Sequence, residues 1–359
     1  MPEIVDRADA FQRRHRVVGF PLGVVYKYFD DQGPYLAAIL TYYAFIAIFP
    51  LLLIASSVLG FVLQGNQELQ DQLLDSALSS IPIVGTQLGR PEGLTGSTSA
   101  VVIGSLAALY GALGLGQAAQ NALNVAWAVP RNSRLNPLVS RWRSLVLLAT
   151  GGLALLTLTA LTIFVSNLGN FGIDVNAWLR WITPLTAIAL TTLFLAVMMR
   201  YTTSRRPSFR TSLPGALFIA VAWHVLQIAG NQYVTRVIAK ASEMNAVFAL
   251  VLGLLALIFL AAALAVLGIE LNVVLNRRLY PRALLTPFTD NVSLTEADRR
   301  AYGMYAKMQR HKGFQTVSVD FLDRTAGSEQ EVPVDQVPLD QVEMEPVSGS
   351  EGASTSEWR

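Results

Sequence analysis

Long runs of apolar residues dominate the pattern of this chain. A helix needs about 20 apolar residues, at about 1.5 Å each, to cross the hydrocarbon core of a bilayer. Six runs reach that length, and the charged residues cluster between them. The pattern predicts an all-α polytopic membrane protein with six transmembrane helices in a domain that covers 35–280. The predicted spans are 35–63, 98–127, 143–166, 178–199, 211–232 and 245–275.

The composition supports this interpretation. Only 14% of the residues are charged and 52% are hydrophobic, whereas a soluble domain has about 25% charged residues. Aromatic residues stand near the ends of several runs, which is typical of the membrane–water interface. The alternative, a soluble bundle of buried helices, rarely has runs this long without a charge.

Lys and Arg residues alternate between the connections. The N-terminal arm, the connections 128–142 and 200–210, and the segment after the sixth run are rich in Arg, whereas 64–97, 167–177 and 233–244 carry at most two basic residues each. Positive residues collect in short cytoplasmic loops. The alternation therefore predicts that both termini lie in the cytoplasm, and a missed or extra span would break it.

Residues 1–34 form a cytoplasmic arm in which 16–29 mixes apolar residues with a few charges. This mixture favours an interfacial helix that leads into the first span. The basic residues before it would be attracted to anionic headgroups, so membrane lipids are expected partners.

The longest connection, 64–96, has leucines near helical spacing with acidic residues between them, as in Leu69, Asp71, Leu73 and Asp75. The spacing predicts an amphipathic helix on the outer face. The helix would lie on the membrane or cap the bundle, and the alternatives are a gate or a segment that binds a protein partner.

The end of the chain, 286–359, is interpreted as an acidic, disordered cytoplasmic tail. Ten acidic and two basic residues fall within 313–359, and no apolar periodicity persists there. Such a composition is typical of disorder. The tail is either without a specific role or a docking segment for a protein partner.

Polar residues inside the spans are the candidates for function, because an ionisable group costs several kcal/mol there unless it is paired or hydrated. The second span carries four amides at offsets of 0, 3, 4 and 7, which place them on one helical face. Together with a carboxylate on the sixth span and hydroxyls on the first, they predict a polar pocket open toward the cytoplasm. Its members are Glu270, Gln117, Gln120, Asn121, Asn124, Thr41, Tyr42 and Tyr43.

The alternative for this pocket is that the amides join neighbouring helices, with about 0.6 kcal/mol for each hydrogen bond. The carboxylate of Glu270 favours a substrate or proton path instead. A second candidate face on the fifth span carries His224, Gln227 and Asn231, which would relay protons or bond across helices.

The chain contains no cysteine and three histidines that lie far apart in the sequence. Thiolate chemistry is therefore excluded, and no catalytic motif or metal-ligand spacing is present. We expect no cofactor, no bound metal and no enzymatic activity. The basic loops lack the stacking aromatics of RNA-binding modules, so no nucleic-acid partner is expected, and the pattern favours no particular oligomeric state.

The first span and its approach carry the motif G-x-x-x-A-A-x-x-T-Y-Y-x-x-x-x-x-F-P-L-L, which runs from Gly33 to Leu52. This motif resembles a signature of the YihY/BrkB family of bacterial inner-membrane proteins. A second stretch, 113–133, resembles another signature of that family, a polar helix end that runs into a Trp and a basic loop. The end of the sixth span, GIELNVVLN, is similar as well, so the resemblance covers about 15–280. The first signature is carried by Gly33, Ala37, Ala38, Thr41, Tyr42, Tyr43, Phe49, Pro50, Leu51 and Leu52.

The resemblance implies a six-span protein of the bacterial plasma membrane but no settled activity. The family's older ribonuclease BN label has no support in these residues. We therefore expect a transporter or flippase for an envelope lipid or amphiphile, with Glu270 as a charge-sensing or proton-coupled group. The alternatives are a scaffold that binds envelope-assembly partners through 64–96 or the tail, and third, a membrane enzyme.

Overall fold

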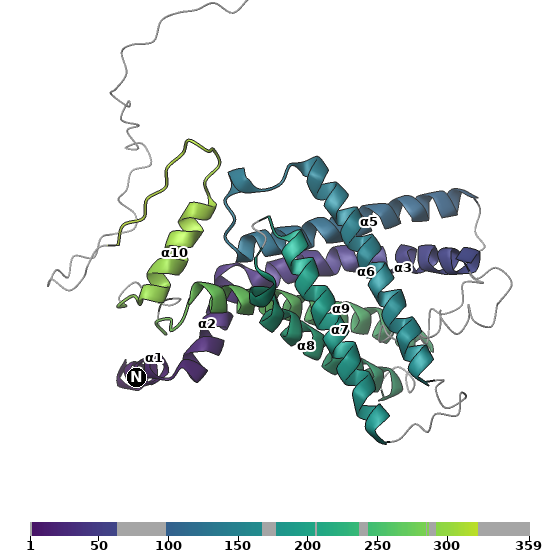
Figure 1. Ribbon diagram of the computed structural model, residues 1–359, viewed down its shortest axis with the longest axis horizontal. Helices are drawn as coiled ribbons and strands as arrows, with labels where there is room; N and C mark the ends of the chain where they lie inside the picture. Colours follow the sequence, from purple (N-terminus) through teal and green to yellow (C-terminus); the bar gives the residue numbers. More distant parts are fainter. Residues whose placement is uncertain are drawn as a thin grey trace, which may run out of the picture. The chain divides into compact units, whose positions relative to one another are not determined.

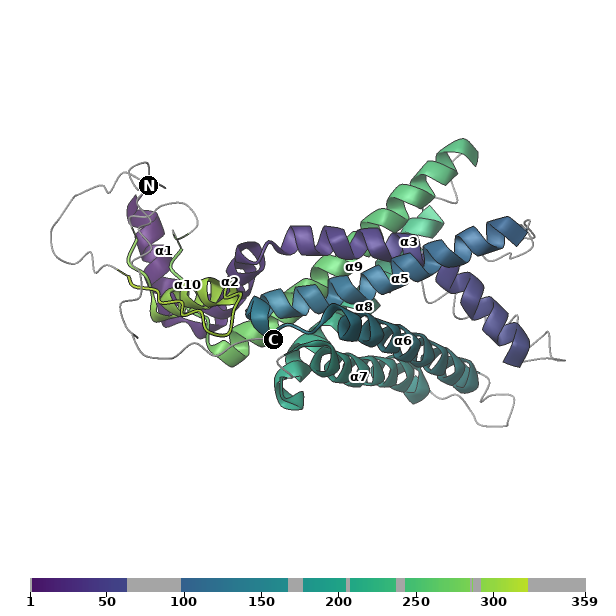
Figure 2. The same ribbon diagram turned by 90° about the horizontal axis from the view of Figure 1, so that it is seen from above.

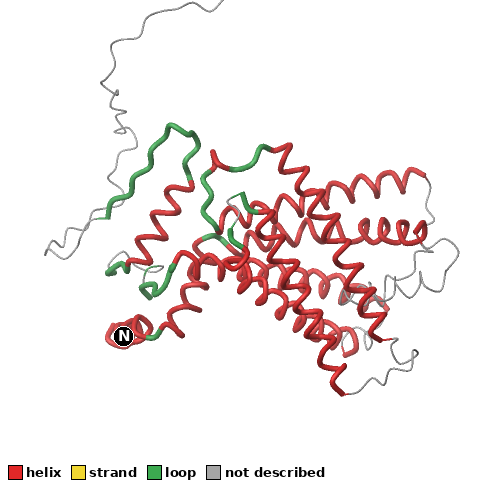
Figure 3. Tube along the Cα trace, viewed as in Figure 1, coloured by secondary structure: helices red, strands yellow, loops and turns green. Residues whose placement is uncertain are grey.

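A computed structural model describes residues 2–62, 98–166, 177–204, 207–236, 243–284, 286 and 292–321. Residues 1–319 form one compact unit, and 320–359 form a second unit of which 320 and 321 are described. All regular secondary structure in the described residues is helical (Figure 3). The all-α prediction is confirmed for this part of the chain.

Six long helices coincide with the six apolar runs. Several boundaries follow local sequence. For example, α6 begins at Pro137, a residue favoured in a first turn, and the Asn136 side chain accepts the Leu138 N–H at 3.1 Å. The helices are α3 (Gly33–Val62), α5 (Thr98–Ala126), α6 (Pro137–Ser166), α7 (Ala177–Thr202), α8 (Phe209–Arg236) and α9 (Glu243–Arg277).

Three helical segments in the described residues are long and apolar enough to cross a membrane: Pro184–Thr202, Phe209–Arg236 and Phe248–Arg277. In the most apolar 18-residue stretch of each segment, only 22%, 22% and 28% of the residues, respectively, are buried inside the protein. Apolar helices that leave most of their surface uncovered require an apolar surrounding. The chain is therefore a membrane protein.

The long helices pack in a connected set, with α3 against α5 and α9, α8 against α7 and α9, and α6 against α5 and α7 (Figures 1 and 2). Glycines permit the closest approaches. A Cβ on Gly215 of α8 would lie 1.9 Å from the Gly268 carbonyl oxygen of α9. The largest buried cluster joins the ends of α5, α7 and α9 to the start of α8 and includes Leu123, Met199 and Val273.

Two helices precede the long ones, α1 (Pro2–Arg14) and α2 (Arg16–Asp30). The helix expected over 16–29 is thus present. One face of α2 is buried against α9, whereas Val17, Val18 and Phe29 are exposed. Its interfacial placement stays a prediction.

The expected disorder from residue 286 onward is wrong for α10 (Glu296–Met308). Thr295 and Asp298 form a reciprocal capping box that satisfies backbone N–H groups at the helix start. Ala297 and Ala301 are buried. In both views α10 lies at the same end of the molecule as α1 and α2 (Figures 1 and 2). The acidic segment 322–359 and the amphipathic segment 64–96 lie outside the described residues.

Candidate functional site

A buried lysine lies at the end of α2, where four helices meet. The Lys27 ammonium pairs with Asp31, one helical turn further along, and lies 3.4 Å from Glu270 Oε2 on α9. It donates a hydrogen bond of 3.1 Å to the carbonyl of Ala126, the last residue of α5. From α10, the ring of Tyr305 lies 5.2 Å from the Lys27 nitrogen. We call Lys27, Asp31 and Glu270 the lysine cluster.

The lysine cluster has an unbalanced charge and no access to water. The side chains of Lys27 and Glu270 are 0% exposed and that of Asp31 is 1% exposed. One lysine faces two carboxyl groups, so the fully ionised cluster has one more negative than positive charge. An uncompensated charge in such a site is costly, so the cluster favours one bound proton on a carboxyl group.

The ionisation of Lys27 and Asp31 agrees with this balance. Burial disfavours the charged lysine, but Glu270 and Asp31 outweigh it and raise the pKa of Lys27 above its usual value. Burial raises the pKa of Asp31, and the attraction of Lys27 offsets this only in part. The lysine thus remains charged while the carboxyl groups compete for one proton.

A second set of charges lies beside the first, and we call Asp30, Arg282 and Asp298 the arginine cluster. Arg282 Nη2 lies 2.9 Å from Asp30 Oδ2, and its Nε lies 2.5 Å from Asp298 Oδ1. Asp298 also accepts the N–H of Ala283 at 3.1 Å. The Asp30 side chain is 24% exposed, so this cluster reaches water whereas the lysine cluster does not.

Tyr305 joins the two clusters, since its hydroxyl lies 3.4 Å from Asp30 Oδ2 while its ring covers Lys27. Burial, followed by the negative charges of Asp31 and Asp30, raises the pKa of the Tyr305 phenol. The phenol therefore stays neutral and serves as a hydrogen-bond donor. Through Tyr305, α10 covers one side of Lys27 in the lysine cluster.

The structure does not form the expected open pocket around Glu270, because the Glu270 side chain is fully buried and paired with Lys27. The pairing of Lys27 with Glu270 was not predicted from the sequence, where Lys27 is one of several basic residues in the N-terminal arm. A signal was available, since Lys27 and Asp31 are spaced by four residues, about one helical turn, at the end of a mostly apolar stretch. The capping pattern at Thr295 and Asp298 was a second missed signal.

Three of the four amides of the second span bond to residues outside α5, one to another helix and two to connecting segments. Gln120 Nε2 donates to the Ser140 carbonyl and to Ser144 Oγ, both at 2.9 Å, which ties α5 to α6. Asn124 Oδ1 accepts the N–H of Ser204 at 3.2 Å, and the exposed Asn121 accepts from Arg134 at 3.1 Å.

The other predicted members make fewer connections. Gln117 is half-buried. Thr41 is buried and donates to the Ala37 carbonyl of its own helix at 2.7 Å. Tyr43 packs where Gly114 leaves space, and Tyr42 is 55% exposed. These contacts are those of helix packing, and a functional role for the set stays a prediction.

The second candidate face lies on α8. His224 and Gln227 are half-buried, and Asn231 is exposed. The proton relay suggested for this face stays a prediction.

A buried amide that the sequence analysis did not select lies two residues after Glu270. Asn272 accepts the Gly215 N–H at 2.7 Å and donates to the Ser212 carbonyl at 3.1 Å, which joins α9 to α8. Within the described residues, no group of three His, Asp or Glu residues is placed to hold a metal ion.

Comparison with known families gives one match along most of the chain. The family model described as Virulence factor BrkB matches residues 24–290. This range includes both cations of the two clusters and ends before α10. No curated protein and no solved structure matches the chain.

Proposed function

The chain belongs to the BrkB virulence-factor family, and from its buried charges we propose that it moves a lipid or another amphiphile across the membrane. In this proposal all six long helices span the bacterial plasma membrane and both termini are cytoplasmic. The alternation of basic and nonbasic connections supports this orientation. The lysine cluster is the proton-binding gate of the transporter.

The observation that carries the proposal is the excess carboxyl group in the lysine cluster. One pair of opposite charges would suffice to join α2 to α9. The second carboxyl group is not needed for that contact, and it gives the cluster a place to bind one proton. Gain or loss of one proton changes the net charge of a site with no access to water. Ionisable groups kept in such places in membrane proteins are typical of proton relays and substrate paths.

The location of the cluster suggests how a proton would act. Lys27 contacts the ends of α5 and α9 and the ring of Tyr305. With a proton bound, the cluster is neutral and α2 stays packed on α9. When the proton leaves, one carboxylate lacks a partner, and hydration of the cluster requires α2 or α10 to move away. Proton binding would thereby be coupled to opening at this end of the helices.

Purified full-length protein in liposomes tests the proposal. The probe is phosphatidylglycerol with a short fluorescent acyl chain, whose exposure in the outer leaflet is measured by chemical quenching. We expect the wild-type protein to accelerate the movement of the probe between leaflets at a rate that depends on pH. Glu270→Gln should lower the rate and flatten the pH dependence.

Glu296→Gln is the matched control, because Glu296 is an exposed carboxylate on α10. It should leave the rate and its pH dependence unchanged. The proposal would be refuted by wild-type protein that moves the probe no faster than empty liposomes at every pH. A Glu270→Gln protein with the wild-type rate and pH profile would likewise remove the gate from the mechanism.

A further inference from the structure

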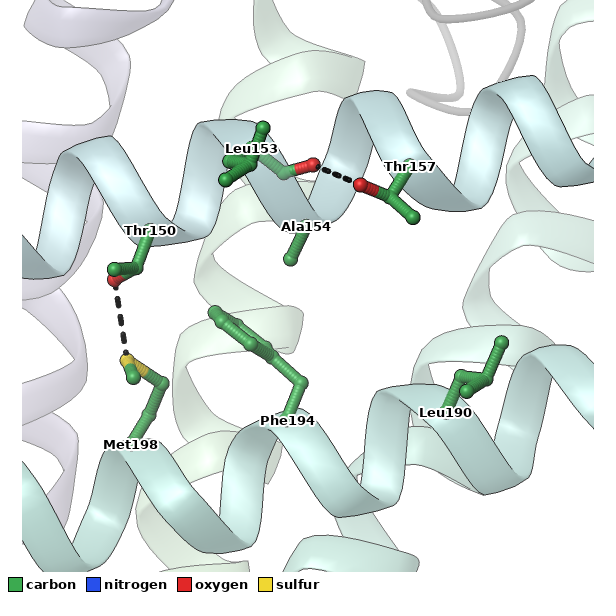
Figure 4. Close-up of a pocket in the computed structure, with 7 residues that line it drawn as sticks. All are labelled: Thr150, Leu153, Ala154, Thr157, Leu190, Phe194 and Met198. Atoms are coloured by element: carbon green, nitrogen blue, oxygen red, sulfur yellow. Dashed lines mark hydrogen bonds between the residues drawn. The ribbon is translucent and has the colours of Figure 1, made fainter.

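A hollow of about 390 Å³ lies between α6 and α7, away from the charged clusters (Figure 4). Leu153, Leu190 and Phe194 line it together with the hydroxyl-bearing Thr150 and Thr157. In the close-up Ala154 of α6 and Leu190 and Phe194 of α7 point into the space between the two helices. At one end of this space, Thr150 Oγ1 lies 3.5 Å from Met198 Sδ.

The hollow is open to the outside of the protein. Leu153 and Leu190 are 65% and 37% exposed although both are large and apolar. The helix α7 belongs to the segments that are apolar enough to cross a membrane. An exposed apolar hollow on such helices faces hydrocarbon, so its natural occupant is an acyl chain.

Arg143 lies on the same face of α6 as two of the residues that line the hollow. Arg143, Thr150 and Thr157 are spaced by seven residues, which is close to two helical turns, so they share one side of the helix. Arg143 Nη1 donates to the Tyr201 carbonyl at 3.3 Å, and the guanidinium lies 5.4 Å from the centre of the Tyr201 ring. In the described part of the chain, Arg143 makes no ion pair with a carboxylate.

Arg143 therefore keeps both its charge and most of its hydrogen-bonding capacity for a ligand. A guanidinium has five N–H donors, and the Tyr201 carbonyl accepts from one of its nitrogens. Arginine is well suited to phosphate because its planar donors match two oxygens at once. The ring of Tyr201 holds the guanidinium beside the helix end.

The spacing along α6 fits the layers of a bilayer. Arg143 and Thr150 are separated by about 10 Å at 1.5 Å for each residue, and the headgroup layer is about 5–8 Å thick on each side of the hydrocarbon core. Arg143 thus lies at headgroup depth when the hollow lies among the acyl chains. The neighbouring Trp142 is 66% exposed, as is typical of an interfacial residue.

We propose that the α6–α7 hollow is a binding site for an anionic phospholipid, with one acyl chain between Leu153, Leu190 and Phe194 and the phosphate on Arg143. The basic connections that adjoin this end of α6 and α7 indicate the cytoplasmic leaflet, where anionic lipids are enriched. The site does not rest on the proposed transport activity, because binding can be measured whether or not a lipid is moved.

Photocrosslinking of the full-length protein in phosphatidylcholine vesicles tests the site. The probe is phosphatidylglycerol with a photoreactive group in one acyl chain, and a matched phosphatidylcholine probe reports contact that does not depend on charge. We expect the phosphatidylglycerol probe to label 150–157 and 190–198. An excess of unlabelled phosphatidylglycerol should suppress this labelling, and phosphatidylcholine or soluble glycerol phosphate should not.

Two pairs of variants separate the phosphate contact from the acyl contact. Arg143→Gln should reduce the preference for phosphatidylglycerol by about fivefold, as expected from one basic residue at the membrane surface. Arg143→Lys should restore part of it, and the exposed neighbour Arg141→Gln should leave it intact. Ala154→Trp should fill the hollow and suppress labelling by both probes, whereas Ala149→Trp, at an exposed position outside the hollow, should not.

Equal labelling by the two probes, or labelling of 150–157 that survives Ala154→Trp, would overturn the proposal. So would suppression by soluble glycerol phosphate at the same phosphate concentration, because the acyl chain would then contribute nothing. The competition experiment uses wild-type protein, so it decides the matter even where a variant does not fold. Failure of lipid movement in liposomes together with specific labelling would refute the proposed function and leave this site standing.

Discussion

Two kinds of polar contact hold the helices together in this protein. Ion pairs join them at the charged end of the molecule, and neutral amide hydrogen bonds join the long helices elsewhere. The lysine and arginine clusters each place one cation between two carboxyl groups, where α2, the segment after α9, and α10 meet. Between the long helices, Gln120 and Asn272 form neutral hydrogen bonds at backbone contacts. Buried charges depend strongly on their partners, whereas a membrane amide bond contributes little.

The difference separates two kinds of polar residue that the sequence places together. Glu270 and Asn272 are two residues apart on α9, yet one joins a charged cluster and the other fixes the approach of α8. We infer that the charged end is where protonation alters the structure, and that the amide contacts keep the long helices in register. Substitutions at the charged end should therefore destabilise the protein more than substitutions at the amide contacts.

Removal of the lysine should have the largest effect. Lys27→Met leaves Glu270 and Asp31 buried without a cation, and loss of one partner from a buried pair costs about 3–5 kcal/mol. Denaturation of the purified protein in detergent should show this loss, and the double variant Lys27→Met/Glu270→Met should recover part of it. The exposed Lys307→Met is the control, and an equal loss for both lysines would contradict a special role for Lys27.

A methyl group at the contact between α8 and α9 should have the next largest effect. In Gly215→Ala the new Cβ would lie 1.9 Å from the Gly268 carbonyl oxygen and 2.5 Å from Asn272 Nδ2. Overpacking of this kind costs about 1–3 kcal/mol, measurable as a lower melting temperature. Gly152→Ala meets no atom within 4 Å and should be neutral or stabilising, so a similar loss in both variants would argue against close contact at Gly215.

Loss of one amide contact should have a small effect. Gln120→Leu removes the hydrogen bonds from α5 to Ser140 and Ser144 of α6, and such bonds contribute about 0.6 kcal/mol on average in membranes. The matched variant is Gln117→Leu, on the same helix, since Gln117 has no hydrogen bond with another described residue. If Gln117→Leu had the larger effect on stability or on movement of the lipid probe, the predicted functional role of Gln117 would be favoured over packing.

The pH dependence of stability should be modest, because the attraction of Lys27 opposes the effect of burial on Asp31. A carboxyl pKa that is raised by folding gives stability that is complete below the ordinary value of about 3.9 and is lost as the pH rises through the raised value. The melting temperature should therefore fall as the pH rises above about 4. Asp31→Asn should flatten this slope, and an unchanged slope would assign the proton elsewhere.

The fold could be predicted from sequence because each long helix depends on local composition. The apolar runs coincide with α3 and α5–α9, although α6 begins at Pro137, six residues before the predicted start of its span at 143. The mixed segment 16–29 likewise coincides with α2. The failure at α10 has a physical reason: the helix is polar, and its stability depends on burial of Asp298 and Ala301. Composition alone therefore made it resemble the acidic segment that follows.

The candidate site was predicted less well, for a related reason. Glu270 was selected because it is an ionisable residue within an apolar span, but periodicity gives only the face of its own helix. The side chains expected beside it were chosen by depth in the membrane, and depth does not determine which helices are neighbours. No sequence motif predicts the hollow between α6 and α7, because it is the space left between the apolar faces of two helices.

The helical, apolar character of six segments can thus be read from the amino-acid order, because both properties follow from residues close in the chain. The alternating basic connections, on which the proposed orientation depends, are also visible in that order. The pairing of Glu270 with Lys27, the position of Tyr305 of α10 over Lys27, and the position of Arg143 at the end of an apolar hollow become visible in the folded structure alone. Those relations join residues far apart in sequence, and they are fixed by how the helices pack rather than by the preference of any one segment.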